Sequence, residues 1–432
     1  MSTTVTLAQL QELAAGGDAE AQFCLGGALF DQGQTEPALA WLARAAKAGH
    51  GRAELALALI HVDGQRVPRD LERARQWLAS AAGRGLAEAC YRLAELDGFA
   101  VFGSVDPVRV REQLLAGARG GFAPALRVLG FACAEHGRYQ AARAWLDAAA
   151  RAGDGPALHA LGLCWLRGLG GESDAAAAAL CFQEAARRGE YRSRVRLAEL
   201  SGVTPAFRAT AVPDPATLPE PGALPPEPAF QHLRDSPWLR QAAGAFNELE
   251  CDYLINLAAH RVKPSMIVHP ATGERQLDPI RTSAHFTVEP VLHDLIVENL
   301  EQRLARWAGL PALNGEFFSL LKYRPGEEYK LHNDYFNPAL PGSAVSLADG
   351  GQRVQTLLVY LNDEFEGGGT RFPRAELNVV PKRGDLVHFH NVDATGQVNP
   401  DSLHAGLPVL SGEKWLASKW VRAESYPPRL RW

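Results

Sequence analysis

The sequence predicts an α+β protein of two domains, a right-handed α-solenoid followed by a β-sandwich or barrel of the jelly-roll kind. Two observations carry this prediction. The first half of the chain repeats itself with a period of 32–36 residues, and the second half contains short β-type runs separated by turn residues. A length of 432 residues fits two or three domains.

The repeat of the first half is marked by one glycine in each unit. A leucine stands eight residues after each glycine, and a small residue, alanine or serine, stands four residues after it, which is helical spacing. We expect the glycine to end a helix. Units of this length cannot bury their own apolar face, so they stack. The glycines are Gly17, Gly49, Gly85, Gly121, Gly153 and Gly189, and the leucines are Leu25, Leu57, Leu93, Leu129, Leu161 and Leu197.

A proline-rich segment follows the repeats, which stop near Ser201. Eight prolines lie between Pro205 and Pro228. Proline removes backbone donors and favours an extended chain, so we interpret residues 204–229 as a semi-rigid linker. A plain spacer is favoured over a segment that docks a partner. The solenoid then comprises residues 1–203, and the second domain comprises residues 230–432.

The second domain combines one helix with several strands. Residues 291–307 have apolar positions near helical spacing and predict an amphipathic helix. Short β-type runs follow, separated by turn residues such as Gly367-Gly368-Gly369. Several short strands behind a helix are typical of a sandwich or barrel. The predicted strands are residues 317–323, 355–361, 385–389, 404–410 and 414–421.

Composition and charge exclude several classes of function. Lys and Arg total 44 against 49 Asp and Glu, a net charge of −5, which gives no electrostatic footprint for nucleic acid. We find no apolar run long enough to span a bilayer and no signal-peptide pattern, so no membrane association is expected. Six cysteines without a CxxC pair predict reduced, mostly buried thiols in a cytoplasmic protein.

The sharpest chemical motif is a histidine and an aspartate two residues apart, His332 and Asp334. Residues two apart on a strand face the same side, so this pair can present an imidazole and a carboxylate together. Two histidines and one carboxylate on one face of a metal hold iron in non-haem Fe(II) oxygenases. The alternative is a solvated pair, or one that supports other ligands.

A third ligand must be a distant histidine, and His388, His390 and His404 are the candidates. We prefer His404, because it begins a β-run that a tight turn connects to the strand starting at Lys414. Such a hairpin places a ligand at one end and a cation on the adjacent strand. His388 and His390 are expected on the more polar face of their own strand.

Eight segments of the second domain occur in a specific order and spacing: residues 278–283, 323–329, 332–336, 358–363, 366–372, 381–384, 402–409 and 412–415. With them, the stretch from about Asp278 to Arg422 resembles the prolyl 4-hydroxylase group of 2-oxoglutarate- and Fe(II)-dependent dioxygenases. The resemblance implies a double-stranded β-helix (jelly-roll) oxygenase domain. Residues 7–200 resemble the Sel-one-like repeat, a relative of the tetratricopeptide repeat, most weakly where Gly98–Pro107 interrupts the third unit.

The resemblance also implies roles for individual residues. Iron would be bound by His332, Asp334 and His404. Lys414 would pair with the distal carboxylate of 2-oxoglutarate, with Tyr323 as a further donor and Thr370 as a weaker candidate near the same pocket. A core aromatic is the alternative for Tyr323. Candidates for contacts with the substrate are Arg353, Trp420 and Tyr335, against packing or surface roles.

The implied activity is oxidative decarboxylation of 2-oxoglutarate to succinate and CO2, coupled to hydroxylation of a C–H bond, with ascorbate as a helpful reductant. The resemblance favours a prolyl residue of a peptide or protein, which the repeats would recruit. Another residue, a free amino acid or a small metabolite stays open as the substrate, and so does a role in sensing oxygen or 2-oxoglutarate. A rival interpretation is a non-catalytic repeat adapter with a degenerate oxygenase domain, which a complete ligand set disfavours.

Overall fold

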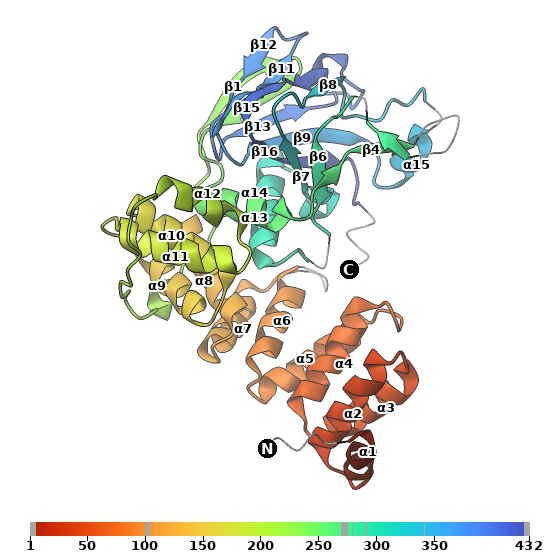
Figure 1. Cartoon of the computed structure of the whole chain (residues 1–432). Helices are drawn as coiled ribbons and strands as arrows, with labels where there is room; N and C mark the ends of the chain where they lie inside the picture. The colour runs from red at the N-terminus through yellow and green to blue at the C-terminus, as the bar shows by residue number, and fades with distance from the viewer. Residues whose placement is uncertain are drawn as a thin grey trace. The chain divides into compact units, whose positions relative to one another are not determined.

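The computed structural model describes residues 6–99, 104–268, 275–278, 280–289, 292–340 and 342–426. Residues 1–5, part of the segment used to argue against a signal peptide, lie outside these ranges. Helices come first and strands follow, as predicted (Figure 1). The chain forms two compact units. The first is Met1–Leu129 with Arg151–Gly153 and Glu220–Gly222, and the second is the remainder.

The first unit consists of helices that pack against their neighbours in the chain. They are α1 (Leu7–Ala15), α2 (Ala19–Asp31), α3 (Thr35–Lys47), α4 (Gly51–Asp63), α5 (Leu71–Gly83), α6 (Ala87–Gly98), α7 (Pro107–Arg119) and α8 (Ala123–Glu135), the last of which continues into the second unit. The repeat glycines follow helix ends with positive φ, for example +85° at Gly49. Ala53 and Leu57 are buried. The predicted helical repeat is therefore confirmed, although residues 100–103 of its interrupted third unit lie outside the described residues.

Four more repeat helices belong to the second unit, together with the strands. They are α9 (Tyr139–Arg151), α10 (Gly155–Arg167), α11 (Ala175–Arg187) and α12 (Tyr191–Glu199). At the repeat position where other units have alanine, Ser193 donates its hydroxyl proton to His159 Nδ1 at 2.7 Å. The opposite ring nitrogen of His159, Nε2, donates to a carboxylate of α13 (Glu248–Ala259), the helix that follows the proline-rich segment.

That carboxylate is Asp252 of α13. It accepts from His159 Nε2 at 3.0 Å and pairs with Arg192 Nε at 3.0 Å and Arg196 Nη2 at 3.3 Å. All four side chains are buried, and we call them the Asp252 cluster. Burial opposes ionisation of Asp252, but Arg192, His159 and Arg196 outweigh it and hold its pKa well below its usual range. The cluster therefore ties the last repeat to the helix that precedes the sheets.

The proline-rich segment contains only a short 3₁₀ turn, η1 (Pro215–Thr217). Its residues up to Pro219, which belong to the second unit, are fastened to helices of that unit. Ala206 N donates to Ala176 O, and the Arg138 guanidinium donates to Leu218 O at 2.8 Å. The extended conformation predicted from the prolines is thus held by hydrogen bonds along the helices.

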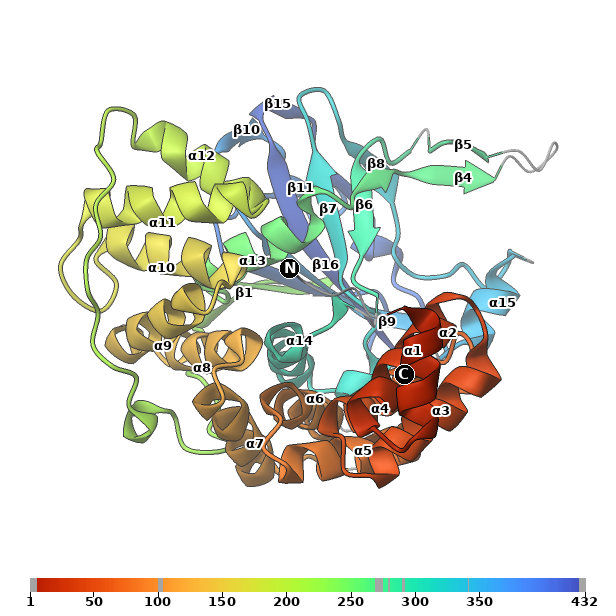
Figure 2. The same ribbon diagram turned by 60° about the horizontal axis from the view of Figure 1, so that its bottom comes forward.

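Strands of the second unit form two main antiparallel sheets (Figure 2). The major sheet has the order β1 (Phe230–Asp235), β2 (Trp238–Ala242), β13 (Leu386–His390), β9 (Arg353–Tyr360), β16 (Lys414–Arg422), β7 (Ser319–Tyr323), β6 (Ala284–Thr287) and β3 (Lys263–Pro264). The minor sheet has the order β12 (Leu377–Val379), β11 (Thr370–Phe372), β14 (His404–Gly406) and β8 (Tyr329–His332). Buried side chains of both sheets, such as Leu358 and Phe372, form one apolar core. The predicted two-sheet domain is confirmed.

Smaller elements complete the unit. Two short ladders join β10 (Phe365–Gly367) to β15 (Val409–Gly412) and β4 (Met266–Val268) to β5 (Arg275–Leu277). Helix α14 (Leu295–Ala308) contacts the major sheet, for example where Gln355 Nε2 donates to Ala308 O. It begins later than predicted, because the Asp294 side chain accepts from Ile296 N and Val297 N and so caps it. Remaining helices are η3 (Ala312–Asn314), α15 (Ser343–Ala348) and η4 (Pro400–Ser402).

The predicted hairpin from His404 to Lys414 is wrong. Residues 404–410 form two strands, not one: β14 pairs with β8 and β11, and β15 pairs with β10. Pro408, which has no N–H to donate, lies between them. Strand β16, which begins at Lys414, pairs with β7 and β9 of the other sheet. His404 and Lys414 therefore approach the same space from facing sheets.

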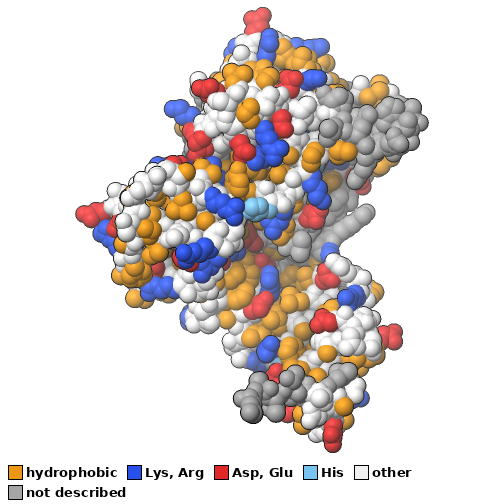
Figure 3. Space-filling model, in the orientation of Figure 1, with side chains coloured by type: hydrophobic (Ala, Val, Ile, Leu, Met, Phe, Trp, Pro, Cys, Tyr) orange, Lys and Arg blue, Asp and Glu red, His pale blue; other side chains and the backbone are white. Residues whose placement is uncertain are grey.

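Charged side chains of both signs are interspersed among apolar ones on the face shown in Figure 3. Five of the six cysteines are buried, as predicted, and Cys24 is exposed. Within the described ranges, none of the helices has both the length and the apolar character needed to cross a bilayer.

Candidate active site

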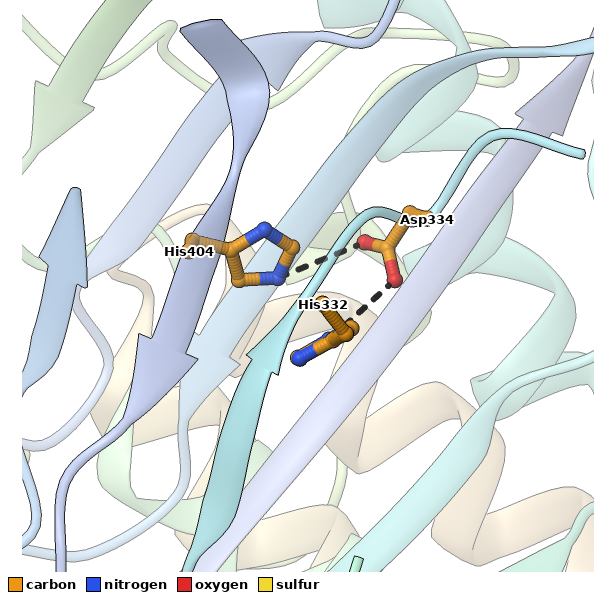
Figure 4. A group of neighbouring side chains, drawn as sticks. All are labelled: His332, Asp334 and His404. Carbon is orange, nitrogen blue, oxygen red and sulfur yellow. Dashed lines mark ion pairs between the residues drawn. The ribbon is translucent and has the colours of Figure 1, made fainter. Parts of the chain in front are cut away.

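The two histidines and the aspartate predicted as ligands meet on the minor sheet (Figure 4). His332 ends β8 and lies directly opposite His404, the first residue of β14. Asp334 follows β8 and turns its carboxylate to both rings, with Oδ1 3.5 Å from His332 Nε2 and Oδ2 3.7 Å from His404 Nε2. One ligand atom from each residue lies within 4.8 Å of the other two.

Backbone carbonyls fix the orientation of both imidazoles. His332 Nδ1 donates to Lys330 O at 2.8 Å, and His404 Nδ1 donates to Ser402 O at 2.9 Å. Because Nδ1 of each ring is engaged by a backbone carbonyl, Nε2 is the atom that faces Asp334 and that is left to bind a metal. The Tyr329 ring stacks on His332 at 3.4 Å between centroids.

The electrostatics of the three groups suit a cation. Burial, reinforced by the nearby His332, lowers the pKa of His404 to about 4, so this ring is neutral at pH 7. Burial alone would raise the pKa of Asp334, but interactions with His404 and His332 hold it well below its usual range. Two imidazoles and one carboxylate, each already oriented, are the donor set that fits Fe(II) in a facial triad.

A buried hydrogen-bond chain positions the carboxylate. The Thr356 hydroxyl of β9 donates to Asp334 Oδ2 at 2.8 Å and accepts from Asn391 Nδ2 at 2.9 Å. Thr356 and Asn391 are fully buried. Sequence reasoning missed both residues, because no local motif connects a threonine on β9 with an aspartate that follows a strand of the other sheet.

Replacing Thr356 with valine, which keeps the shape and removes the hydroxyl, is expected to weaken Fe(II) binding by about 10–100-fold, the usual effect of losing a partner of a metal ligand. Thr356→Ser retains the hydroxyl and should retain most of the affinity. The measurement is an anaerobic Fe(II) titration, with Thr287→Val on the exposed face of β6 as the matched control. Equal affinities for Thr356→Val and wild type would show that the hydroxyl does not position Asp334.

The residues predicted to hold 2-oxoglutarate lie in the same cavity as the ligands. Lys414 and Tyr323 are cross-strand partners on β16 and β7, and both line the cavity with His332, Asp334, His404 and Thr370. Lys414 is buried and Nζ donates to Gly368 O at 2.6 Å. Burial lowers the pKa of Lys414 to about 7, so an arriving carboxylate would favour its charged form.

The three candidates for substrate contact are placed differently. Trp420 lines the cavity, whereas Arg353 and Tyr335 are not among its lining residues. Arg353 makes a bidentate pair with Glu316, both N–O distances being 2.7 Å, and its guanidinium lies 3.9 Å from the Trp420 ring centroid. Arg353 thus supports Trp420, and a direct contact of any of the three with substrate stays a prediction.

The remaining histidine candidates do not join the triad. His388 is buried on β13, where it accepts from Arg240 Nε at 3.1 Å and donates to Gln355 Oε1 at 2.8 Å. The Gly367–Gly369 segment forms the predicted turn, with positive φ at Gly367 and Gly368.

A second group with ligand-type atoms escaped sequence reasoning. His293, Glu298 and Glu301 lie together at α14, all buried. Lys419 Nζ of β16 lies 2.7 Å from Glu301 Oε1, so an ammonium group already provides the positive charge there. The signal available in the sequence was the pair of glutamates three apart on an otherwise apolar helix face.

Comparisons with known proteins agree with this geometry. Residues 318–422 match the family model described as 2OG-Fe(II) oxygenase superfamily. The Sel1 repeat model matches residues 19–50, 51–86, 87–109, 123–154 and 155–190.

Two plant proteins and one viral structure are similar to the second half. Prolyl 4-hydroxylase 1 of Arabidopsis thaliana is 38% identical over 190 residues, which cover 41% of this chain and 65% of that protein. Probable prolyl 4-hydroxylase 6 of the same plant is 35% identical over 202 residues, covering 42% and 68%. The viral collagen prolyl hydroxylase of Paramecium Bursaria Chlorella virus-1, solved with 2OG, is 29% identical, with a TM-score of 0.34 and coverage of 43% and 96%. The chain spans 65–66% of the length of the first curated relatives.

Proposed function

Because the chain belongs to the 2OG-Fe(II) oxygenase superfamily, with a domain related to prolyl 4-hydroxylases and Sel1 repeats before it, we propose that it hydroxylates a prolyl residue of a peptide or protein. The reaction consumes 2-oxoglutarate and O2 and yields succinate, CO2 and the hydroxylated residue. The observation that carries the proposal is the meeting of three metal-ligand side chains and the buried Lys414 in one cavity.

Each group of the cavity has a defined task in this proposal. Fe(II) and 2-oxoglutarate, when bound, supply the oxidising chemistry. His332, Asp334 and His404 would hold Fe(II) through the two imidazole Nε2 atoms and the carboxylate. Lys414 pairs with the distal carboxylate of 2-oxoglutarate and so orients it. Leucine side chains of β7, β9 and β16 line the space between the sheets and exclude water from it.

Support for a prolyl substrate comes from the relatives that are named prolyl 4-hydroxylases at 33–38% identity. We include in the proposal that the repeats recruit the substrate protein, since stacked helices present extended surfaces. We also include ascorbate as a reductant that keeps the iron ferrous.

The experiment supplies Fe(II), 2-oxoglutarate and ascorbate with a polyproline peptide, and measures succinate together with the peptide mass. We expect peptide-dependent succinate and a mass gain of one oxygen atom on proline, with little from free proline. Lys414→Ala should raise the KM for 2-oxoglutarate by about 10–100-fold, the worth of a charge-assisted hydrogen bond. Lys382→Ala, at an exposed position, is the control. Succinate without any oxygen on proline would place the substrate in another class.

A further inference from the structure

Two connected cavities lie in the repeat part of the second unit, between α9, α10 and the proline-rich segment. Their volumes are about 220 Å³ and about 930 Å³, and the larger one falls within the size range of ligand pockets. We call them together the Arg143 groove. They share five lining residues: Gln140, Ala144, Gly170, Gly171 and Ala211. None of the residues lining either cavity lines the catalytic cavity.

The groove contains a buried cation without an acidic partner. Arg143 of α9 is 6% exposed and lines the smaller cavity. Its guanidinium lies 3.5 Å from the Trp165 ring centroid, and its one hydrogen bond, to Glu172 O, is 3.5 Å long. No carboxylate among the described residues forms an ion pair with it. Buried arginines are normally paired, because an uncompensated charge is costly to desolvate.

A neighbouring arginine, unlike Arg143, is paired with acidic side chains. Arg208 of the proline-rich segment also lies over Trp165, at 5.2 Å. Its two terminal nitrogens are already paired with carboxylates, with Asp174 at 3.1 Å and with Glu172 at 3.4 Å. Asp174 and Glu172 are thus bound by the exposed arginine and leave the buried one for a ligand. The larger cavity also contains Asp214, whose carboxylate accepts from Ala216 N and caps η1.

The larger cavity adds a second source of positive potential. It is lined by residues 137–141, which contain the start of α9. The first turn of this helix of 13 residues carries no acidic side chain, and the amide groups of a helix N-terminus favour an anion. Arg143 lies one turn further along the same helix. The helix end and the guanidinium therefore favour the same kind of ligand.

The rest of the groove suits a peptide. Its other wall is the extended proline-rich segment, where Val212 is 87% exposed beside the larger cavity. A planar guanidinium held flat on an indole ring presents its donors in one plane, which matches a carboxylate. We propose that the Arg143 groove binds an extended peptide segment of a partner protein through the carboxylate of one Asp or Glu side chain. The proline-rich segment, for which the sequence favours a plain spacer, is then one wall of a docking site.

This inference does not depend on catalysis, so it can be tested on the full chain without iron or 2-oxoglutarate. Random peptides displayed on phage are selected against the immobilised protein, and the strongest binder is synthesised with a fluorescent label for anisotropy titration. We expect the selected peptides to share one acidic residue. Its replacement by Gln or Asn, and the variant Arg143→Gln, should each weaken binding by about 10–100-fold.

The matched control is Arg187→Gln on α11, an exposed arginine that is paired with Glu184, which should bind the peptide like wild type. Because Arg143→Gln breaks no ion pair and loses only the contact with the Trp165 ring, it should lower the thermal midpoint of the free protein by no more than a few degrees. Selection of no peptide, equal binding by Arg143→Gln, or equal binding of the carboxylate-free peptide would overturn the proposal. A lowered midpoint with unchanged peptide affinity would assign Arg143 to packing instead.

Discussion

Replacing His404 with alanine is expected to reduce succinate formation to background while the chain stays folded. The substitution removes one of three ligand atoms, and the two that remain, on β8 and just after it, come from one strand end. His404 is also the ligand that ties the second strand, β14, to the metal. Its ring lies 4.8 Å from the Phe389 centroid and 3.7 Å from the Asp334 carboxylate, so the substitution removes a contact within the site and no ion pair elsewhere in the fold.

The measurement pairs succinate output with an anaerobic titration of Fe(II) and 2-oxoglutarate, in which the visible charge-transfer band reports the assembled site. His332→Ala and Asp334→Ala should behave like His404→Ala. His232→Ala, at a half-exposed histidine of β1, should behave like wild type. A full band and normal succinate in any of the three ligand variants would contradict the assignment.

Replacing Asp252 with asparagine is expected to destabilise the second unit strongly. The variant keeps the shape of the side chain but removes the fully buried carboxylate that Arg192 and Arg196 share. Both arginines keep the more exposed Glu364, and Arg196 also keeps Glu248. Removing one partner of a buried pair typically costs about 3–5 kcal/mol. In a unit of this size the thermal midpoint should fall by roughly 6–20 °C.

The matched control is Asp235→Asn, whose side chain is fully exposed and pairs with His232. It should change the midpoint very little. The wild-type contribution is lost as the pH falls, because the folded pKa of Asp252 lies below its unfolded value of about 3.9. We therefore expect the wild type and the variant to converge in stability only below about pH 4. An unchanged midpoint at pH 7 would mean that Glu248 and Glu364 neutralise the arginines alone.

Local patterns predicted the helical half of the fold and the ligand pair well. The repeat glycines, the small residues and the leucines make their contacts within one pair of adjacent helices. Their spacing in the sequence therefore predicts which of them lie close together. His332 and Asp334 were predictable for the same reason, because two residues on a strand share a face. His404 was predicted as a ligand too, but on the wrong grounds, since no hairpin joins it to Lys414.

What local patterns could not supply is the pairing of distant strands. Thr356 reaches Asp334 across the gap between two sheets, and nothing within either segment indicates the partner. The Asp252 cluster was invisible for a similar reason. Arg192 and Arg196 are one helical turn apart, a spacing typical of a solvated face, and only their burial against α13 gives them a structural role.

The division of the chain into residues 1–203, 204–229 and 230–432 stays a prediction about sequence modules. Compactness divides the chain elsewhere, because the helices after Gly130 belong with the sheets. The sequence period marks the repeats, whereas compactness marks which segments pack together. The Asp252 cluster is one reason for the difference, because it joins the last repeat to α13.

That cluster also limits how genes for such proteins can be rearranged. A crossover placed in the proline-rich segment exchanges whole repeats, yet it separates the two arginines of the cluster from three carboxylates that pair with them, those of Asp252, Glu248 and Glu364. In such a chimaera Asp252 stays buried without its two arginines, unless the incoming repeats carry arginines at the same two helical positions. Crossovers upstream of α9 leave the cluster intact. Among descendants with different numbers of repeats, gains and losses should therefore accumulate at the N-terminal end, while the last two helix pairs are inherited together with the enzyme.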